Sequence, residues 1–275
     1  MNRDKLFFFD IDGTLLDMSG QMQESAKRAL RQLKHNGHGI LIASGRTRPE
    51  IPETIVRFGF DGMVLGNGSY AEYGGKVLRS EILGDKTAAA IIEYLYQNRA
   101  LIMASTPEGV YMTAKTQEYI FRRLLCEAGK VGELAAEMRP ILVNKEQFRN
   151  LELVIKIIYM NLKTDRIDLI RRFSDVVTVM PNSIHSLADA HSGEIVKKGI
   201  NKAAGIAVLL QHLGRDFTDV VTFGDGINDI EMLQEAALGI AMENGAEAAK
   251  KAADYITGSI ADHGIERALK YYKYI

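Results

Sequence analysis

Cysteine is nearly absent from this sequence, and that absence limits both its covalent chemistry and its possible metal sites. Cys126 is the only cysteine among 275 residues, so no disulfide can form within the chain. A cluster of thiolate ligands for a metal ion is excluded for the same reason. The lack of disulfides suits a reducing compartment, and we expect a cytoplasmic protein.

An excess of charge and a long apolar run are lacking as well. The 34 Lys and Arg residues nearly balance the 35 Asp and Glu residues, for a formal net charge of −1, so nucleic acid is not expected as the principal partner. The apolar run at residues 6–9 ends at Asp10, and the run at residues 151–160 is interrupted by Glu152 and Lys156. Both are far shorter than the roughly 20 residues that cross a bilayer, so we expect no membrane partner.

The two ends of the chain share a pattern of short apolar strands and amphipathic helices. Residues 5–9 are rich in apolar and aromatic side chains, which is typical of a strand buried on both faces of a parallel sheet. A helix over 21–35 and strands at 39–43 and 63–65 complete a βαβ unit. The C-terminal part repeats this order, with helices expected at 202–213, 229–236 and 246–252 and strands at 219–223, 238–242 and 254–256. The pattern predicts an α/β fold with a doubly wound, mostly parallel, Rossmann-like sheet.

The middle of the chain follows a different pattern. Strands are expected at 100–104, 110–113, 151–159 and 176–180, and they alternate with helices at 86–97, 118–128 and 165–173. This mixture predicts an inserted α+β domain at residues 83–190, with residues 1–82 and 191–275 forming the core domain. No proline-rich linker marks either boundary.

Three carboxylates are expected where predicted strands end. Asp10 and Asp12 follow the first strand, and Asp225 follows the strand at 219–223. The carboxyl ends of the strands in a doubly wound sheet border one crevice, so these side chains should converge there. Carboxylates this close repel each other unless they share a cation or one is protonated. An all-oxygen cluster without His or Cys favours Mg²⁺.

These acidic motifs also have purely structural interpretations. The sequence Asp-x-Asp-Gly by itself is typical of a turn that caps the next helix. That interpretation weakens because the motif follows a buried strand and because Gly-Asp-Gly-Ile-Asn-Asp at 224–229, which contains Asn228 and Asp229, follows another. An EF-hand loop is excluded, since Ile227 occupies the third loop position, where an oxygen ligand is required.

Two further candidates are ambiguous when each is taken alone. A serine after a strand, such as Ser44, usually caps a helix, although its hydroxyl and the N–H groups that follow can also hold a phosphoryl oxygen. Spacing does not choose among Lys197, Lys198 and Lys202, and most lysines are solvated surface charges. No Walker A sequence is present, so nucleotide binding of the P-loop type finds no support.

Taken together, the segments resemble the motifs of the haloacid dehalogenase-like (HAD) hydrolase superfamily. Residues 7–16, 42–46, 199–206 and 223–233 resemble its four motifs in order, and residues 240–246 resemble the stretch that follows them in the Cof-type subfamily (type IIB, with a C2 cap). The resemblance covers residues 5–82 and 191–268 and selects Lys202 as the motif lysine. It departs from the usual pattern at Asn201, Ala203 and Glu243, which affects fine positioning.

The resemblance implies a Mg²⁺-dependent phosphatase and a role for each motif residue. Asp10 would be the nucleophile that forms an aspartyl-phosphate, and Asp12 the general acid and base. The implied ligands of Mg²⁺ are the carboxylates of Asp10 and Asp225 and the backbone carbonyl of Asp12, with Asp229 behind them or as a further ligand. The phosphate-binding residues would be Ser44, Gly45, Lys202 and Asn228. Arg46 either touches the ester group or forms a surface ion pair.

Two other functions stay open on the same residues. A sugar phosphomutase would use Asp10 and Asp12 but return the phosphoryl group to its substrate. A non-catalytic, phospholigand-binding regulator would not need both carboxylates. For the phosphatase, the expected partner is a small-molecule phosphate ester, either a sugar phosphate or a phosphorylated cofactor. The sequence chooses neither the ester nor the oligomeric state.

Overall fold

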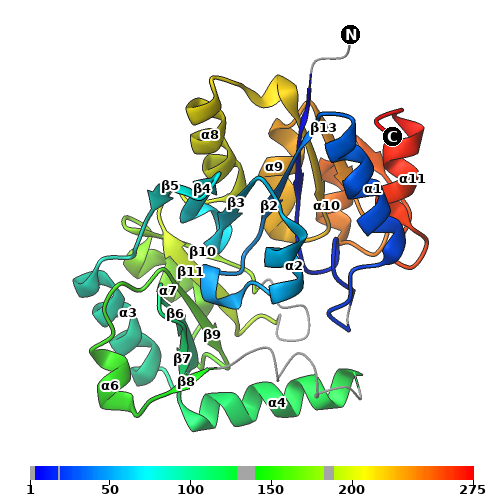
Figure 1. The fold of residues 1–275 in the computed structure, drawn as a ribbon. Coiled ribbons are helices and arrows are strands. Elements are labelled where there is room, and N and C mark those ends of the chain that lie inside the picture. Colours follow the sequence, from blue (N-terminus) through cyan, green and yellow to red (C-terminus); the bar gives the residue numbers. More distant parts are fainter. Residues whose placement is uncertain (1–3, 18, 129–139, 183–188) are drawn as a thin grey trace. The chain divides into compact units, whose positions relative to one another are not determined.

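The chain folds into two compact units. The computed structural model describes residues 4–17, 19–128, 140–182 and 189–275 (Figure 1). The first unit contains Met1–Gly45, Glu53–Ser80 and Asn201–Ile275, and the second contains Arg46–Pro52 and Glu81–Ile200. Each unit has its own sheet.

A mostly parallel sheet forms the centre of the first unit. Its strands are β1 (Leu6–Phe9), β2 (Gly39–Ala43), β3 (Gly62–Leu65), β4 (Tyr70–Tyr73), β5 (Lys76–Ser80), β12 (Val220–Gly224), β13 (Leu238–Ala241) and β14 (Tyr255–Ile256). Among the described residues their order is β14-β13-β12-β1-β2-β3-β4-β5. The strands from β14 to β3 pair in parallel, whereas β4 pairs antiparallel with both β3 and β5. The central strands β12, β1 and β2 therefore end at the same edge of the sheet.

Helices cover both faces of this sheet. They are α1 (Glu24–His35), α2 (Glu53–Phe58), α8 (Lys202–Leu213), α9 (Ile230–Glu235), α10 (Glu247–Ala252) and α11 (Gly264–Tyr271). Successive side chains of a strand point to opposite faces. Phe8 accordingly packs in one cluster with Ile206 of α8, while the ring of Phe7 contacts that of Tyr274, which follows α11. Figure 1 shows α8 and α11 on opposite sides of the sheet. Because both faces are buried, the strands read as continuous apolar runs.

The second unit is built on a mainly antiparallel sheet. Its strands are β6 (Leu101–Ser105), β7 (Val110–Met112), β8 (Ile141–Leu142), β9 (Lys156–Met160), β10 (Val177–Met180) and β11 (Gly193–Lys197). In the described part of the unit they run in the order β10-β11-β9-β6-β7-β8, and only β7 and β8 pair in parallel. The helices are α3 (Asp85–Gln97), α4 (Ala114–Ala128), α6 (Lys145–Arg149) and α7 (Arg166–Phe173). Ile91, Phe148 and Leu169 from three of these helices pack in one apolar cluster with Tyr159 of β9.

The structure confirms the expected fold class and refines the expected elements. The mostly parallel α/β sheet is present, as is a second unit of mixed helices and strands. The hairpin of β4 and β5 was not expected, although Gly74 and Gly75, both with positive φ, are a typical signal for a two-residue hairpin turn. The expected boundary at residue 190 differs from the structure, because β11 pairs with β9 and β10 and so belongs to the second unit.

In the described ranges, no helix is both long enough and apolar enough to span a bilayer.

Helix α8 lies unusually close to the strand and turn beside it. A Cβ atom on Gly205 would lie 2.4 Å from Val64 Cγ1 and 2.8 Å from the Cα of Gly68. Gly68 itself ends the 3-10 turn η2 (Gly66–Gly68), and a Cβ there would lie 2.1 Å from the carbonyl oxygen of Asn201. Two glycines without side chains thus allow the N-terminal end of α8 to pack directly on the turn after β3.

We expect Gly205→Ala to destabilise the protein, against the ordinary preference of a helix for alanine. Helix propensity alone would stabilise this variant by about 1 kcal/mol. The forced separation of α8 from Val64 and Gly68 should outweigh that gain and cost about 1–3 kcal/mol net. Urea unfolding measures the difference. Ala207, which is exposed on the same helix, gives the control: Ala207→Gly should cost about 1 kcal/mol from propensity alone. A more stable Gly205→Ala protein would contradict the close packing.

Candidate active site

Four candidate segments of the first unit follow adjacent parallel strands or begin a helix. Asp10 comes directly after β1, Ser44 directly after β2 and Asp225 directly after β12. Lys202 is the first residue of α8. Because β12, β1 and β2 are neighbours in parallel register, their loops lie side by side at one edge of the sheet.

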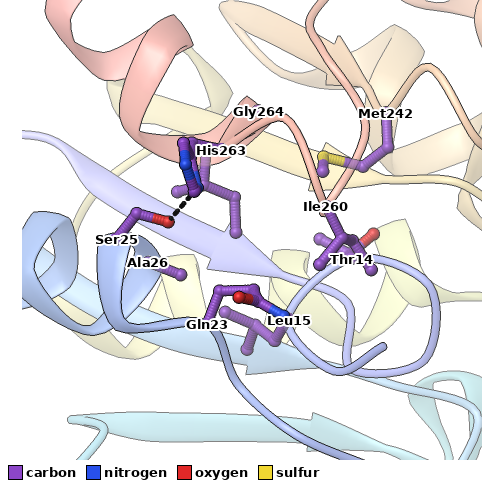
Figure 2. A pocket seen from close by; sticks show the side chains of 10 residues that line it. Thr14, Leu15, Gln23, Ser25, Ala26, Met242, Ile260, His263 and Gly264 are labelled. Atoms are coloured by element: carbon purple, nitrogen blue, oxygen red, sulfur yellow. Dashed lines mark hydrogen bonds between the residues drawn. The ribbon is translucent and has the colours of Figure 1, made fainter. Parts of the chain in front are cut away.

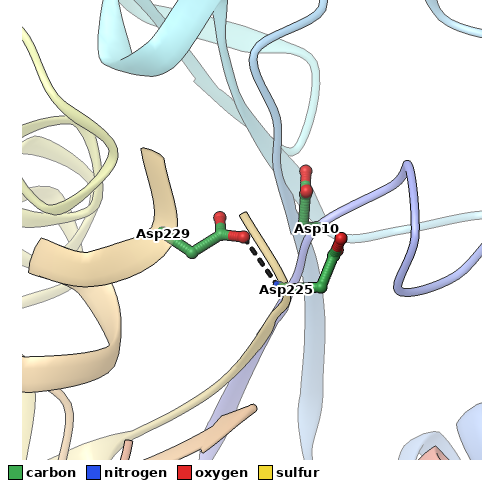
Figure 3. Close-up of side chains that lie close together, drawn as sticks. All are labelled: Asp10, Asp225 and Asp229. Atoms are coloured by element: carbon green, nitrogen blue, oxygen red, sulfur yellow. Dashed lines mark hydrogen bonds between the residues drawn. The ribbon is translucent and has the colours of Figure 1, made fainter. Parts of the chain in front are cut away.

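Three carboxylates gather at this edge, as Figure 3 shows. Asp10, Asp225 and Asp229 each offer a carboxylate oxygen, and these oxygens lie within 4.8 Å of one another. The side chains are removed from water to different degrees: Asp10 is 6% exposed, Asp229 is fully buried and Asp225 is half-buried. Buried carboxylates at this separation are costly unless positive charge accompanies them.

Lys202 supplies part of that positive charge. Its Nζ lies 2.9 Å from Asp10 Oδ1 and 2.5 Å from Asp229 Oδ1, and the lysine side chain is fully buried. Burial alone would lower the pKa of Lys202, but the two carboxylates raise it above its usual value. The ammonium group is therefore held in its charged form. One ammonium balances only one of the three carboxylates.

Burial and uncompensated negative charge together raise the pKa values of two of these carboxyl groups. Burial raises the pKa of Asp10 to about 7; Lys202 opposes this rise, while Asp229 and Asp12 add to it. Burial also raises the pKa of Asp225 to about 8, with Asp10 and Asp229 adding to the rise and the hydrogen bond from Thr14 opposing it. A divalent cation would remove this repulsion, and an all-oxygen donor set suits Mg²⁺. The residues present thus fit the ion that the sequence predicts.

Asp229 is the most constrained of the three carboxylates. Its Oδ2 accepts hydrogen bonds from the backbone N–H groups of Asp225, at 2.9 Å, and Gly226, at 2.7 Å, while Oδ1 is bound by Lys202. Both oxygens of Asp229 are therefore engaged in holding the loop after β12 and the lysine. This geometry favours a supporting role for Asp229, behind Asp10 and Asp225.

The loop after β1 passes very close to Asp225. Gly13 has a φ of +81°, and a Cβ atom there would lie 2.2 Å from Asp225 Oδ2, so no other residue fits without displacement. Thr14 Oγ1 donates to Asp225 Oδ1 at 2.8 Å, and Asn244 Nδ2 donates to the carbonyl oxygen of Gly13 at 2.8 Å. These bonds tie the loops after β1, β12 and β13 together.

Behind Thr14 lies a cavity, which Figure 2 shows. Its lining includes Ser25 and His263, whose Oγ and Nδ1 atoms lie 2.9 Å apart, and its volume is about 10 Å³. A cavity of this size holds at most about one water molecule. It is a packing gap beside the loop after β1, and it is too small to bind a phosphate ester.

Asp12 differs from the other acidic residues because its side chain is exposed. Its backbone forms an isolated β-bridge with Leu16 within the loop after β1. Asp12 lies close enough to Asp10 to raise the pKa of that carboxyl group. Its carboxylate is not part of the close cluster found among the described residues. Binding of a metal ion by its backbone carbonyl stays a prediction.

The candidate phosphate-binding residues lie against Asn67, a residue that the sequence motifs did not reveal. Ser44 is 1% exposed, and Asn228 Nδ2 donates to Asn67 Oδ1 at 3.0 Å. A Cβ atom on Gly45 would lie 3.0 Å from Asn67 Oδ1 and 3.3 Å from Asn228 Nδ2. The structure thus brings Gly45, Asn67 and Asn228 together. The available signal for Asn67 was its position two residues after the end of β3, comparable with the other strand ends.

Arg46 is the one candidate that lies outside the first unit. It begins the segment Arg46–Pro52 of the second unit, where its Nη1 donates to the carbonyl oxygen of Glu50 at 2.9 Å. Its side chain is half-buried. Contact between Arg46 and an ester group stays a prediction.

Comparison with known proteins finds a family that matches nearly the whole chain. Haloacid dehalogenase-like hydrolases match residues 7–269 of this chain. The chain is 29% identical to 5-amino-6-(5-phospho-D-ribitylamino)uracil phosphatase YbjI of Escherichia coli (strain K12), with 95% of this chain and 93% of that protein covered. It is also 29% identical to the chloroplastic endoribonuclease YBEY of Arabidopsis thaliana; there 97% of this chain is covered, but it spans only 46% of the relative.

A solved structure shows the same similarity in three dimensions. It is the structure of a sugar phosphatase of HAD subclass IIB, and its TM-score against this chain is 0.81 at 25% sequence identity. The match covers 98% of this chain and 100% of that one. Both units of the fold therefore have counterparts in that protein.

We expect the metal-free protein to lose stability as the pH rises from about 5 to about 8. The pKa values of Asp10 and Asp225 are raised from 3.8 to about 7 and about 8, so the folded state retains protons that the unfolded state has released. The free energy of unfolding then falls with rising pH across this window, and Mg²⁺, which binds the ionised groups, should reverse the loss. Thermal melting across this range, in EDTA and in Mg²⁺, measures both effects.

The double variant Asp10→Asn/Asp225→Asn provides the control for this pH dependence. It carries amides in place of the two carboxyl groups, so its stability in EDTA should depend less on pH than that of the wild type. Equal slopes for the two proteins would show that other groups cause the dependence.

Proposed function

This chain belongs to the haloacid dehalogenase-like hydrolases, and we propose that it is a Mg²⁺-dependent phosphatase that hydrolyses small-molecule phosphate monoesters through an aspartyl-phosphate on Asp10. One observation carries the proposal. Asp10 stands at a strand end beside Asp225 and Asp229, with Lys202 Nζ 2.9 Å from its Oδ1. A carboxylate attacks phosphorus readily once nearby positive charge neutralises the incoming phosphoryl group.

The acidic cluster is the proposed Mg²⁺ site. Asp10 and Asp225 would bind the ion through their carboxylates and Asp12 through its backbone carbonyl. Asp229 would hold Lys202 and the loop after β12 in place, as its hydrogen bonds indicate. When bound, Mg²⁺ supplies positive charge that neutralises the phosphoryl oxygens.

The proposed reaction takes place in two steps. The Asp10 carboxylate attacks phosphorus while the bond from phosphorus to the ester oxygen breaks, and Asp12 donates its proton to the leaving alkoxide. Asp12, now ionised, takes a proton from a water molecule that attacks the phosphorus of the aspartyl-phosphate. Inorganic phosphate leaves and the Asp10 carboxylate is restored. The exposure of Asp12 supports this role, because the group must reach both leaving group and water.

The remaining candidates would stabilise the equatorial oxygens of the phosphoryl group. Phosphoryl transfer depends mainly on alignment and on charge stabilisation. The ammonium of Lys202, the hydroxyl of Ser44, the N–H of Gly45 and the amide of Asn228 are the groups proposed for this purpose. The buried position of Ser44 and Lys202 supports the proposal, since electrostatic interactions are stronger away from water.

Relatives narrow the proposed substrate. The Escherichia coli relative is named for a phosphorylated ribitylamino compound, and the similar solved structure is a sugar phosphatase. Both descriptions place the phosphate on a polyhydroxylated carbon chain. We therefore favour a sugar or sugar-alcohol phosphate, and not a phosphorylated cofactor, as the substrate of this chain.

We expect wild-type protein with Mg²⁺ to release inorganic phosphate from such esters and Asp10→Asn to lose nearly all of this activity. An amide is a poor nucleophile, so the rate should fall by roughly 10⁴-fold or more. Phosphate release is measured from a panel of sugar, sugar-alcohol, pyridoxal and flavin phosphates, with Mg²⁺ or EDTA. Asp168 is exposed on α7, and Asp168→Asn gives a control with the same chemical change.

The panel also separates the competing functions. Isomerised sugar phosphate without free phosphate would show a phosphomutase. Binding of phosphate esters without any turnover would show a regulator. Activity that persists in Asp10→Asn would rule out the proposed nucleophile.

We expect Asp12→Asn to bind Mg²⁺ normally but to lose about 10²–10⁴-fold in turnover of alkyl phosphates, because proton transfer is lost. With p-nitrophenyl phosphate, whose leaving group needs no proton, the first step should persist while hydrolysis of the aspartyl-phosphate slows. Rapid mixing should then show a burst of p-nitrophenolate followed by slow turnover, and calorimetry measures the affinity for Mg²⁺. A near wild-type rate with alkyl phosphates would remove Asp12 from the proton transfers.

A further inference from the structure

We propose that Asn67 is a positioning residue for phosphoryl binding, which acts by orienting the Asn228 amide against the Ser44–Gly45 turn. The inference rests on the proposed function, because it concerns the phosphate-binding side of the same site. It assigns a role to a buried asparagine that lies outside the four sequence motifs. The contacts of Asn67 with two segments of the first unit, and the contact of its neighbour Gly68 with a third, carry the argument.

The backbone of Asn67 is held in an uncommon conformation. Asn67 lies in the turn η2, directly after β3, with φ 56° and ψ 28°, and it is 1% exposed. Asparagine tolerates this left-handed region better than most residues. Its buried polar side chain needs hydrogen-bond partners. Backbone preference alone would be met equally well by glycine, so the side chain is the feature to explain.

The first contact joins Asn67 to the turn after β2. Its backbone N–H donates to the carbonyl oxygen of Ser44 at 3.1 Å. A side chain on Gly45 would lie 3.0 Å from Asn67 Oδ1. The amide of Asn67 therefore lies directly against the residue that follows Ser44, and it limits how the Ser44–Gly45 turn can move.

The second contact orients Asn228. Asn67 Oδ1 accepts a hydrogen bond from Asn228 Nδ2 at 3.0 Å, and a Cβ atom on Gly226 would lie 2.5 Å from Asn228 Oδ1. The amide nitrogen of Asn228 thus faces Asn67 and the Gly45 turn, and its oxygen lies on the side of Gly226. An amide has two N–H donors, so one remains for a phosphoryl oxygen after Asn67 has accepted the other.

The third contact connects the same turn to the helix of the lysine. Gly68 lies against the carbonyl oxygen of Asn201, the N-cap residue of α8, and against Gly205. Lys202 follows Asn201 directly. Asn67 is therefore placed where the turn after β2, the loop after β12 and the start of α8 meet. Preorganised donors stabilise the charge of a transferring phosphoryl group most effectively when their positions are fixed in advance.

The test is Asn67→Gly, which keeps the left-handed backbone and removes the whole side chain with its amide. Kinetics with p-nitrophenyl phosphate, the inhibition constant of inorganic phosphate, calorimetric affinity for Mg²⁺ and thermal melting are measured for this variant. Loss of one orienting hydrogen bond should raise KM and the inhibition constant of phosphate roughly tenfold, with the affinity for Mg²⁺ unchanged. Asn161, which also has φ 56°, gives the matched control: Asn161→Gly should leave all kinetic constants unchanged.

A double-mutant cycle with Asn228→Ala tests whether Asn67 acts through Asn228. The inhibition constant of phosphate for Asn67→Gly/Asn228→Ala should equal that for Asn228→Ala alone, because the group to be oriented is then missing. Asn67→Ser keeps a neutral polar group that is too short to replace the amide. If Asn67→Gly does not fold, the inhibition constant of phosphate is measured for Asn67→Ser in its place.

The outcomes separate this inference from the function on which it rests. Wild-type phosphate affinity in both Asn67 variants, or fully additive effects in the cycle, would overturn the role of Asn67 while leaving the phosphatase intact. A wild-type protein that neither releases nor binds inorganic phosphate in Mg²⁺ would overturn the proposed function and this inference together.

Discussion

The burial of Asp10, Asp225 and Asp229 around the single ammonium of Lys202 is the constraint from which most of the site's structure follows. Three carboxylates with so little access to water can lie this close together only if each is bound, protonated or paired. Lys202 pairs with two of them, backbone N–H groups bind Asp229, and the Thr14 hydroxyl binds Asp225. The remaining negative charge makes the site suited to a divalent cation.

This arrangement requires short distances between loops, and glycine provides them. Gly13 allows the loop after β1 to reach Asp225, and Gly45 allows the turn after β2 to lie against Asn67 and Asn228. Gly68 and Gly205 allow α8 to begin where its first residue, Lys202, reaches the carboxylates. Without a side chain at these positions, segments distant in sequence approach to backbone contact. The electrostatics of the site therefore depend on the packing of the first unit.

The second unit has its own polar interactions, which explain why it begins before the expected insertion. The carboxylate of Glu50 accepts hydrogen bonds from Thr47 and lies 3.7 Å from the buried ammonium of Lys156 on β9. Ser105 on β6 also donates to Glu50, at 3.3 Å. These contacts attach the segment Arg46–Pro52 to the second unit, although in sequence it follows the Ser44–Gly45 turn directly. Neither Glu50 nor Lys156 lies in a motif or a periodic pattern that would have predicted their ion pair.

Sequence alone determined the strands β1, β2 and β12, the helix α8 and the acidic residues that follow β1 and β12. The reason is that buried parallel strands read as apolar runs and that polar residues after them stand out. The sequence also pointed to Lys202, but only through family resemblance, since spacing could not separate this lysine from its neighbours. The tertiary structure decided the rest: that Asp229 holds Lys202 and its own loop, that Asn67 contacts Asn228, and that β11 pairs within the second unit. Apart from the bonds of Asp229 within its own loop, these features join residues far apart in the chain. A local sequence pattern does not reveal contacts that form only when the sheet assembles.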